Sequence, residues 1–335
     1  MSKAVEELNV GVDLGGTKVE AALVGADGRV VASHRHPTDS KTKGPQGVIA
    51  DIVACVRECL GKGVQNARAL GIGVAGQIDT ATGTVRFAPN LGWRDVPLQA
   101  ELERALRFPV VVVNDVRAAT FGEWAHGAGN GANNLVCLFV GTGIGGGIVS
   151  GGQMLEGCCN MAGELGHMTI VAGGRPCHCR NRGCLEAYVG GWAIAERAQD
   201  AIGADPEAGR YLVSLGGTFE KVTAATIALG YRKGDPLARR LIEETGYYLA
   251  AGLVGIVNAL NPSVLIMGGG VVEGLPELIQ VLDFEVQARA LKAVVEELRI
   301  VKSALGDKAG VIGAAALARS GVAKGSRQNR STIAR

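Results

Sequence analysis

The sequence has no apolar run long enough to cross a membrane. LAAGLVGIVNAL, at residues 249–260, is the longest apolar stretch near a helix, and a spanning helix needs about 20 such residues. The opening residues MSKAVEELNVGVDLGGT also lack the basic stretch and apolar core of a signal peptide. We therefore expect a cytoplasmic protein without membrane contact. Because thiols stay reduced in that compartment, the eight cysteines are not expected to form disulfides.

An excess of charge of one sign is also missing. The chain has 34 lysines and arginines against 32 aspartates and glutamates, and no basic stripe stands out. Since nucleic acids are bound through clustered basic residues, no nucleic-acid partner is expected. Glycine is the one residue in excess, because 51 glycines are about twice the usual share of roughly 7%. Clustered glycines indicate tight turns and close approaches of backbone.

The 335 residues are enough for one large domain or two ordinary ones. A strand, a glycine turn and a second strand are predicted at 9–24, and the pattern returns at 135–149. This repetition indicates an internal duplication with a ligand held between two lobes, although two unrelated hairpins would look the same. Further strands are predicted at 30–37, 69–76, 108–115 and 262–272. Helices are predicted at 47–60, 98–107, 192–201, 236–260, 276–297 and 310–321.

Three glycine-rich turns each follow an apolar strand: DLGGT (13–17), GTGIGGG (141–147) and GGG (268–270). Glycine lets backbone N–H groups approach phosphate, and Thr17 and Thr142 offer hydroxyls to it. Asp13 would repel phosphate and is better suited to hold Mg²⁺. The turns do not form a Walker motif, and a strand rather than a helix follows GTGIGG, which excludes a Rossmann turn. Each turn alone is compatible with an empty hairpin, but the three together favour a nucleotide.

The segment CHCRNRGCLE, at 177–186, gathers three cysteines outside any CxxC pattern, so a thioredoxin-like site is not expected. Zinc in structural sites usually has four ligands. His167 lies ten residues upstream of Cys177, whereas His178 sits between two cysteines and would point away. The sequence thus predicts a structural zinc site of His167, Cys177, Cys179 and Cys184, with reduced and unliganded cysteines as the alternative. The adjacent Cys158 and Cys159 are expected to be packing residues.

Asp115 ends the predicted strand FPVVVVND. A carboxylate at the carboxyl end of a buried strand is well placed for a ligand crevice, but local sequence alone favours a cap of the helix that follows, a role that aspartate fills well. Other side chains offer the oxygen and nitrogen partners that a polyol requires: Asn90, Glu164, His167 and Glu186.

These segments, in this order, resemble the ROK family (repressor, open reading frame, kinase), and within it the bacterial ATP-dependent glucokinases. The resemblance runs from about Val10 to about Ser320. It is carried by VDLGGTK, GVAGQID, APNLGW, VVNDVRAATFGEW, FVGTGIGGGIV, AGELGHMTI and CHCRNRGCLEAYVGG.

The resemblance implies an α/β fold of two lobes with a cleft between them, the duplicated ribonuclease H-like fold of actin, hexokinase and Hsp70. The small lobe would hold residues 1–125 and 306–322, and the large lobe would hold 126–305. The tail at 323–335 is expected to be disordered. The resemblance also suggests a homodimer.

The implied activity is transfer of phosphate from ATP to the 6-hydroxyl of a hexose, with glucose as the first choice. Asp115 would be the catalytic base. The sugar would be bound by Asn90, Asn114, Asp115, Glu164, His167 and Glu186. ATP and Mg²⁺ would be bound by Asp13, Gly15, Gly16, Thr17, Lys18, Gly141, Thr142, Gly143, Gly268, Gly269 and Gly270. As in the family, zinc would be held by His167, Cys177, Cys179 and Cys184, with His167 using its second ring nitrogen for a sugar hydroxyl.

Three residues depart from the family pattern. Arg180 replaces the usual glycine after the second cysteine, and we expect it to fit only with a negative φ or a different loop geometry. Arg117 replaces a small residue just beyond Asp115, and Asn160 stands where the family often has glycine. These departures bear on loop details and sugar preference.

Three alternatives remain. ROK repressors share the sugar and zinc motifs, but they carry a DNA-binding segment ahead of the first strand, where only eight residues precede Asn9, and a pure sensor does not need Asp13 and Asp115. A kinase for N-acetylmannosamine, N-acetylglucosamine, fructose or allose would have the same motifs, since such sugars are told apart by single hydrogen bonds. Polyphosphate as donor would need a basic groove, which the sequence does not predict.

Overall fold

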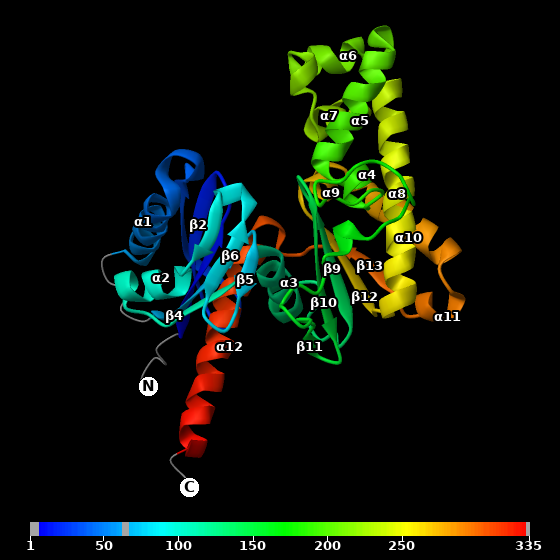
Figure 1. Cartoon of the computed structure of the whole chain (residues 1–335). Coiled ribbons are helices and arrows are strands. Elements are labelled where there is room, and N and C mark those ends of the chain that lie inside the picture. Colours follow the sequence, from blue (N-terminus) through cyan, green and yellow to red (C-terminus); the bar gives the residue numbers. More distant parts are fainter. Residues whose placement is uncertain (1–6, 62–66, 333–335) are drawn as a thin grey trace. The chain divides into compact units, whose positions relative to one another are not determined.

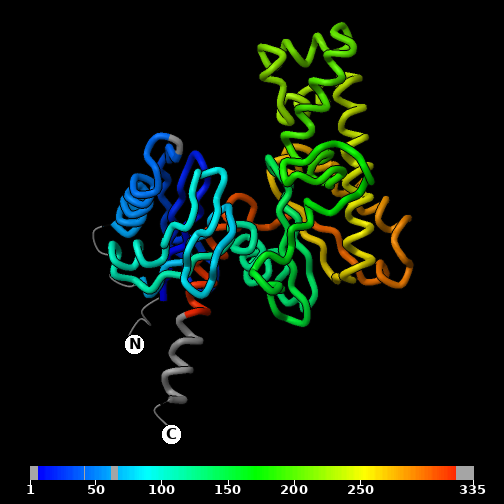
Figure 2. Tube along the Cα trace, in the orientation of Figure 1, coloured from blue at the N-terminus to red at the C-terminus, as the bar shows by residue number. Residues whose placement is uncertain are grey.

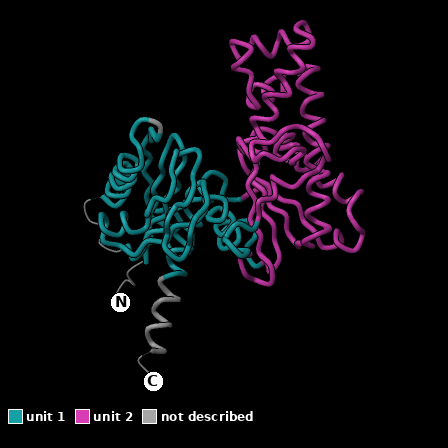
Figure 3. Tube along the Cα trace, viewed as in Figure 1, with its two compact units in different colours: residues 1–131, 156–162, 304–335 teal, residues 132–155, 163–303 magenta. Residues whose placement is uncertain are grey.

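The structure is a computed structural model that describes residues 7–61 and 67–332, with only the helical backbone described over 322–332 (Figure 1). Within these ranges no helix combines the length and the apolar character that a bilayer crossing requires. The chain divides into two compact units (Figure 3): unit 1 holds Met1–Gly131, Glu156–Ala162 and Ala304–Arg335, and unit 2 holds Ala132–Leu155 and Gly163–Ser303. This division differs from the predicted lobes by a few residues at each boundary and by the segment Glu156–Ala162, which packs with unit 1.

Unit 1 is built around a five-stranded sheet in the order β3-β2-β1-β4-β8. Its strands are β1 (Leu8–Leu14), β2 (Lys18–Val24), β3 (Val30–Pro37), β4 (Ala67–Val74) and β8 (Val110–Asn114). The pairings of β3 with β2 and of β2 with β1 are antiparallel, whereas those of β1 with β4 and of β4 with β8 are parallel. The sheet is covered by α1 (Ser40–Leu60) on one face and by α3 (Asp115–His126) and α12 (Ala309–Thr332) on the other. Strand β1, in blue, and the first part of α12, in red, therefore lie side by side within unit 1 although they are far apart in the sequence (Figure 2).

Helix α12 lies unusually close to the sheet because glycines face it. A side-chain carbon built on Gly11 would lie 1.8 Å from the carbonyl oxygen of Val311, and one on Gly71 would lie 1.9 Å from that of Ala314. Such contacts are impossible without moving the helix, so the sheet residues at these two places must be glycine. Helix α12 continues to Thr332, whereas a disordered tail is expected from residue 323; residues 333–335 lie outside the described part of the chain.

We expect Gly71→Ala to lower the free energy of unfolding by about 3 kcal/mol, which is within the usual cost of overpacking a rigid interface. Gly203→Ala is a matched control in α5 (Gly191–Ala204), because its added carbon meets nothing within 4 Å and alanine is a better helix former than glycine by ~1 kcal/mol. Urea unfolding of both variants measures the difference. Equal stability of Gly71→Ala and the parent would contradict the close approach of α12.

A small antiparallel sheet lies between β4 and β8 in the sequence, and the sequence analysis did not predict it. It consists of β5 (Gln77–Asp79), β6 (Thr84–Ala88) and β7 (Trp93–Val96), and α2 (Leu98–Leu106) follows it. The short 3-10 helix Pro89–Leu91, between β6 and β7, carries Asn90. The small sheet thereby positions Asn90.

Unit 2 repeats the topology of unit 1. Its sheet has the order β11-β10-β9-β12-β13, made of β9 (Leu135–Val140), β10 (Ile144–Ser150), β11 (Gln153–Met154), β12 (Val264–Gly268) and β13 (Arg299–Lys302). As in unit 1, the first two pairings are antiparallel and the last two are parallel. The predicted internal duplication thus holds for the two whole sheets and not only for the two hairpins.

The helices of unit 2 follow recognisable start and stop signals. Asp235 caps α8 (Pro236–Leu260) by accepting a hydrogen bond from the backbone of Ala238, and Asn261 ends the helix in the left-handed conformation. The helix predicted over 276–297 is wrong as a single element. The backbone is extended at Ala290 and Leu291, so the chain forms α10 (Leu278–Arg289) and α11 (Lys292–Val295) instead. The remaining helices are α4 (Glu186–Val189), α5, α6 (Pro206–Gly216), α7 (Ala224–Arg232) and α9 (Gly270–Gly274).

Candidate functional site

Two carboxylates lie together at the carboxyl edge of the unit 1 sheet. Asp13 is near the end of β1, and Asp115 directly follows β8, which runs parallel to β1. Burial, together with the negative charge of Asp115, raises the pKa of Asp13 to about 6, and the nearby Lys18 lowers it by less than Asp115 raises it. A half-buried carboxylate next to a second carboxylate is a strong attractor of a cation.

Asn114, and not Asp115, caps helix α3. The side-chain oxygen of Asn114 accepts a hydrogen bond from the backbone N–H of Arg117 at 3.1 Å, and its amide nitrogen donates to the carbonyl of Gly76 at 3.3 Å. The capping alternative for Asp115 is therefore wrong. Asp115 is the first residue of α3, where the positive end of the helix dipole favours a carboxylate.

The first glycine turn packs against Asn90. The backbone N–H of Gly15 donates to the carbonyl of Lys18 at 2.9 Å, and a side-chain carbon on Gly16 would lie 3.2 Å from the carbonyl oxygen of Asn90. The hydroxyl of Ser40, the first residue of α1, contacts the carbonyl oxygens of Gly16 at 3.3 Å and Asn90 at 3.2 Å. Thr17 and Lys18 are exposed. Sequence reasoning missed Ser40, because its role depends on two partners that are distant in the chain.

The four predicted zinc ligands come together in unit 2. The ligand atoms of His167, Cys177, Cys179 and Cys184 all lie within 4.8 Å of one another. A tetrahedral zinc site has sulfur atoms about 3.8 Å apart and a sulfur–nitrogen distance of about 3.6 Å, given Zn–S and Zn–N bonds of about 2.3 and 2.05 Å. The corresponding distances are 3.6 Å between the sulfurs of Cys179 and Cys184, and 3.7 Å from the sulfur of Cys177 to Nδ1 of His167.

The loop that carries the cysteines also contains Arg180, one of the three residues that depart from the family pattern. Arg180 has a φ of +75°, so arginine occupies the left-handed region here, contrary to the expected negative φ. The backbone N–H of Arg180 donates to the carbonyl of Cys177 at 3.0 Å, which closes the turn between the cysteines. His178 lies outside the cluster and stacks on Trp192, with ring centroids 4.0 Å apart.

Glu186 connects the cysteine loop to the second glycine turn. Its carboxylate accepts hydrogen bonds from the backbone N–H of Ile144 at 2.7 Å and from the indole of Trp192 at 3.3 Å. A side-chain carbon on Gly143 would lie 2.5 Å from the same carboxylate, so a larger residue there would displace the carboxylate of Glu186. Glu164 and His167 lie on one short turn, in which the carbonyl of Glu164 accepts from the N–H of His167 at 3.1 Å.

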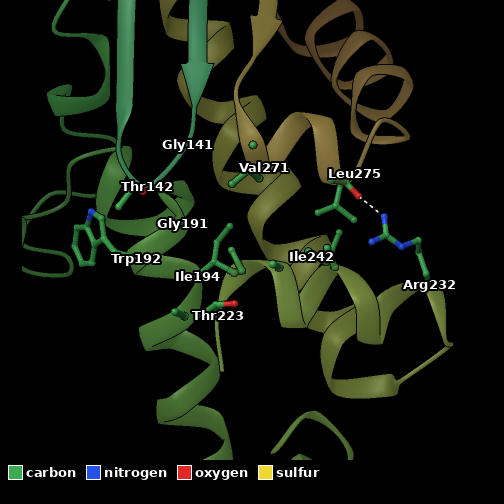
Figure 4. Close-up of a pocket in the computed structure, with 16 residues that line it drawn as sticks. Gly141, Thr142, Gly191, Trp192, Ile194, Thr223, Arg232, Ile242, Val271 and Leu275 are labelled. Atoms are coloured by element: carbon green, nitrogen blue, oxygen red, sulfur yellow. Dashed lines mark hydrogen bonds between the residues drawn. The ribbon is translucent and has the colours of Figure 1, made fainter. Parts of the chain in front are cut away.

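A cavity of about 670 Å³ opens beside the second glycine turn (Figure 4). Gly141 and Thr142 line it, together with Gly270 and small or apolar side chains from α5, α7, α8 and α9. At the opposite end from Thr142, Arg232 donates a hydrogen bond to the carbonyl of Gly274 at 2.8 Å. Sequence reasoning missed Thr223, Ala225 and Arg232, at the start of and within α7, and Ile242 of α8, because these helices carry no motif that marks a ligand.

The third glycine-rich turn, Gly268 to Gly270, lies next to this cavity, but not all of its residues line it. Of its three residues Gly270 is the one that lines the cavity. Gly268 packs on the ring of Phe139, and Gly269, with a φ of +88°, lies against the backbone of Val140. The first two glycines therefore shape the turn after β12.

The other two residues that depart from the family pattern, Arg117 and Asn160, lie in unit 1. Arg117 is buried, and its guanidinium lies 3.6 Å from the carboxylate of Glu156, so it holds the start of the segment Glu156–Ala162. Asn160 has a φ of +60°. Asparagine tolerates this conformation better than most residues, which explains how it replaces glycine.

Comparison with known proteins gives one consistent result. Residues 9–320 match the ROK family. A glucokinase of Streptomyces coelicolor is 36% identical over 317 residues, which cover 93% of this chain and 98% of that protein. The crystal structure of a ROK family glucokinase from Streptomyces griseus, in complex with glucose and AMPPNP, is 35% identical with a TM-score of 0.81 and covers 93% of this chain and 99% of that one. A ROK hexokinase from Thermus thermophilus is 33% identical with a TM-score of 0.80 and covers 95% of this chain and 99% of that one.

Proposed function

The chain belongs to the ROK family, and we propose that it is a glucokinase, which transfers the γ-phosphoryl group of ATP to the 6-hydroxyl of glucose. The observation that carries this proposal is the pairing of Asp115 with Asp13 at one edge of the sheet, beside the first glycine turn and Asn90. Phosphoryl transfer to an alcohol needs a base for the hydroxyl proton and a counter-charge for the phosphates. Two carboxylates with separate tasks satisfy both needs.

Asp115 is the proposed base. As the 6-oxygen of glucose attacks the γ-phosphorus, its proton passes to the carboxylate of Asp115, and the bond from the γ-phosphorus to the bridging oxygen of ATP breaks to release ADP. Asp115 is the first residue of α3, and the positive end of the helix dipole stabilises a negatively charged carboxylate there. Asn114 fixes the geometry of that turn by capping the helix.

Asp13 is the proposed holder of Mg²⁺. Its carboxylate is half-buried and its pKa is raised to about 6, which fits a site that is completed by a cation. When bound, Mg²⁺ neutralises charge on the phosphates. Gly15, Gly16, Thr17 and Lys18 would surround the phosphates from the adjoining turn.

The raised pKa of Asp13 predicts opposite effects of one substitution on stability and on turnover. The folded chain binds the proton of Asp13 more tightly than the unfolded chain. The stability from this group is thus full below about pH 3.8 and is lost as the pH rises through about 6. At pH 7.5 we expect Asp13→Asn to raise the free energy of unfolding of the ligand-free chain by about 1–3 kcal/mol and to abolish MgATP-dependent turnover.

Urea unfolding at pH 7.5 and pH 5, with initial rates at saturating MgATP, tests this expectation. The stabilisation should shrink at pH 5, where the parent carries a proton on Asp13. A variant that keeps its turnover, or that loses stability at pH 7.5, would exclude the proposed role.

The proposed sugar ligands are Asn90, Asn114, Glu164, His167 and Glu186, which together offer amides, carboxylates and an imidazole to the sugar hydroxyls. Nδ1 of His167 faces Cys177, so Nε2 is the nitrogen that would meet a hydroxyl. Each carboxylate oxygen of Glu186 can accept a further bond besides those from Ile144 and Trp192. Hydrogen bonds of this kind place a hydroxyl in line for attack, which contributes much of the catalysis.

Zinc is the proposed occupant of the Cys₃His cluster, in a structural role. The distances among the four ligands fit tetrahedral coordination, and a complete ligand set provides no open position for a reacting water. The loop that zinc would fix carries Glu186 at its end and His167 as a ligand, so the metal site would support the sugar site.

Adenosine would occupy the cavity of unit 2, with the phosphates at Gly141 and Thr142. The apolar lining suits a purine ring, and Thr223 offers a hydroxyl. We expect Ala225→Trp, which replaces an exposed lining residue of α7, to raise the KM for ATP without changing the KM for glucose. Leu229→Trp is the control, because Leu229 is an exposed residue of the same helix outside the lining. Equal ATP kinetics in both variants would place adenosine elsewhere.

Initial rates with MgATP over a panel of hexoses and N-acetylhexosamines test the proposed substrate. The highest kcat/KM with glucose supports the proposal, and the product, glucose 6-phosphate, would then enter glycolysis. Preference for N-acetylmannosamine, N-acetylglucosamine, fructose or allose would keep the reaction and change the substrate. Sugar binding without turnover would indicate a regulator. The homodimer and the cytoplasmic location stay predictions.

A further inference from the structure

Two histidines and a glutamate form a second cluster of metal-type ligands, far in sequence from the proposed zinc site. His34 and His36 are two residues apart on β3, so they point to the same face of the sheet, and that face packs against α1. Glu58 lies near the end of α1. Nε2 of His34 lies 2.7 Å from Oε2 of Glu58, and Nε2 of His36 lies 3.1 Å from the same oxygen.

The arrangement suits an ion better than it suits catalysis or packing. The three ligand atoms all lie within 4.8 Å of one another, and the imidazole rings are 5.1 Å apart, edge to face. The side chains are 41%, 22% and 52% exposed for His34, His36 and Glu58, so solvent reaches the cluster.

The backbone around the cluster is already fixed without an ion. Strand β3 is paired with β2 along its length, with His34 opposite Ala21 and His36 opposite Val19. The buried thiol of Cys55, one turn before Glu58 on α1, contacts the carbonyl oxygen of His34 at 3.4 Å. Arg35 points to the other face, where it pairs with Glu20 and Asp307, so its positive charge does not face the two imidazoles.

We propose that His34, His36 and Glu58 form a second metal site, which binds a divalent transition ion such as Zn²⁺ or Ni²⁺ and keeps water on the remaining positions. Two imidazoles and one carboxylate are a donor set that these ions favour over Mg²⁺ or Ca²⁺. A bound ion joins the edge strand β3 to α1. Because α1 begins at Ser40, which contacts the first glycine turn and Asn90, the ion would stabilise the unit that carries them.

Titration of the full-length chain with Ni²⁺ tests this site, after the Cys₃His cluster has been loaded with zinc. Isothermal titration calorimetry should find one equivalent of Ni²⁺ while a chromophoric indicator reports no release of zinc. The double variant His34→Ala/His36→Ala should lose this equivalent, and Glu58→Gln should weaken it by about tenfold or more, because each lost ligand removes a bond to the ion. The control is His126→Ala, which removes an imidazole of the same unit outside the cluster.

A second readout separates binding from misfolding. Ni²⁺ should raise the thermal midpoint of the parent and of His126→Ala but not that of the double variant, whose turnover should match the parent because these residues lie outside the proposed catalytic machinery. Failure of the parent to bind Ni²⁺, or equal binding by the double variant, would overturn the proposal. Neither result depends on which sugar the enzyme phosphorylates.

Discussion

Asp115→Asn is expected to bind glucose with nearly the parent affinity and to lower kcat by about 10²–10⁴-fold, the usual contribution of a general base. The amide keeps the size and the hydrogen-bonding reach of the carboxylate but cannot take up the proton of the 6-hydroxyl. Since α3 is capped by Asn114, the substitution leaves the helix start in place. Removal of the charge should also lower the pKa of Asp13, because Asp115 is one of the groups that raise it.

Steady-state rates and calorimetric glucose binding measure the two halves of this prediction. Asp95→Asn is the matched control: this exposed carboxylate of unit 1 has a φ of +51°, which asparagine tolerates, and it should leave kcat unchanged. A kcat of Asp115→Asn within a few-fold of the parent would remove Asp115 as the base.

Cys179→Ser has the second large expected effect: loss of zinc, of stability and of glucose affinity together. Cys179 is exposed, so replacing sulfur by oxygen removes a ligand with little disturbance of the core. We expect the zinc content to fall from about one per chain to near zero, because serine is a poor zinc ligand. The free energy of unfolding should fall by at least about 2 kcal/mol, since a metal bound by the folded chain alone contributes its binding energy to stability.

The effect on glucose follows from the position of the loop. His167 is itself a ligand of the cluster, and Glu186 lies two residues after Cys184, so both sugar contacts depend on the loop geometry. Metal analysis, thermal unfolding and the KM for glucose measure the three effects. Cys158 is exposed and lies outside the cluster, so the expectation that it packs is wrong, and Cys158→Ser should change none of the three quantities. Loss of zinc with an unchanged KM would show that the metal does not support the sugar site.

The sequence is most informative where one short segment contains all the residues of a structural motif or of a ligand set. The strand–glycine turn–strand patterns at 9–24 and 135–149 correspond to β1–β2 and β9–β10, because apolar strands and glycine turns are encoded locally. The four ligands of the cysteine loop are also close in sequence, and the structure brings them within bonding reach of one ion. Spacing alone was sufficient in these cases.

Features that depend on distant partners could not be predicted in this way. The cavity of unit 2 is lined by residues from four helices and a turn. The hydroxyl of Ser40 donates to the carbonyl oxygens of Gly16 and Asn90, which are 24 and 50 positions away in the sequence. Local rules also failed where tertiary contacts decide. Arg180 adopts a positive φ in a loop with closely spaced cysteines, and Asn114 takes the capping role that local sequence favoured for Asp115.

The most direct test of the proposed reaction is ³¹P NMR of the product formed from glucose and MgATP. The proposal predicts equimolar ADP and glucose 6-phosphate, with no phosphorylated product from 6-deoxyglucose. A phosphate on any other hydroxyl, phosphorylation of 6-deoxyglucose, or hydrolysis of ATP without a sugar phosphate would contradict it.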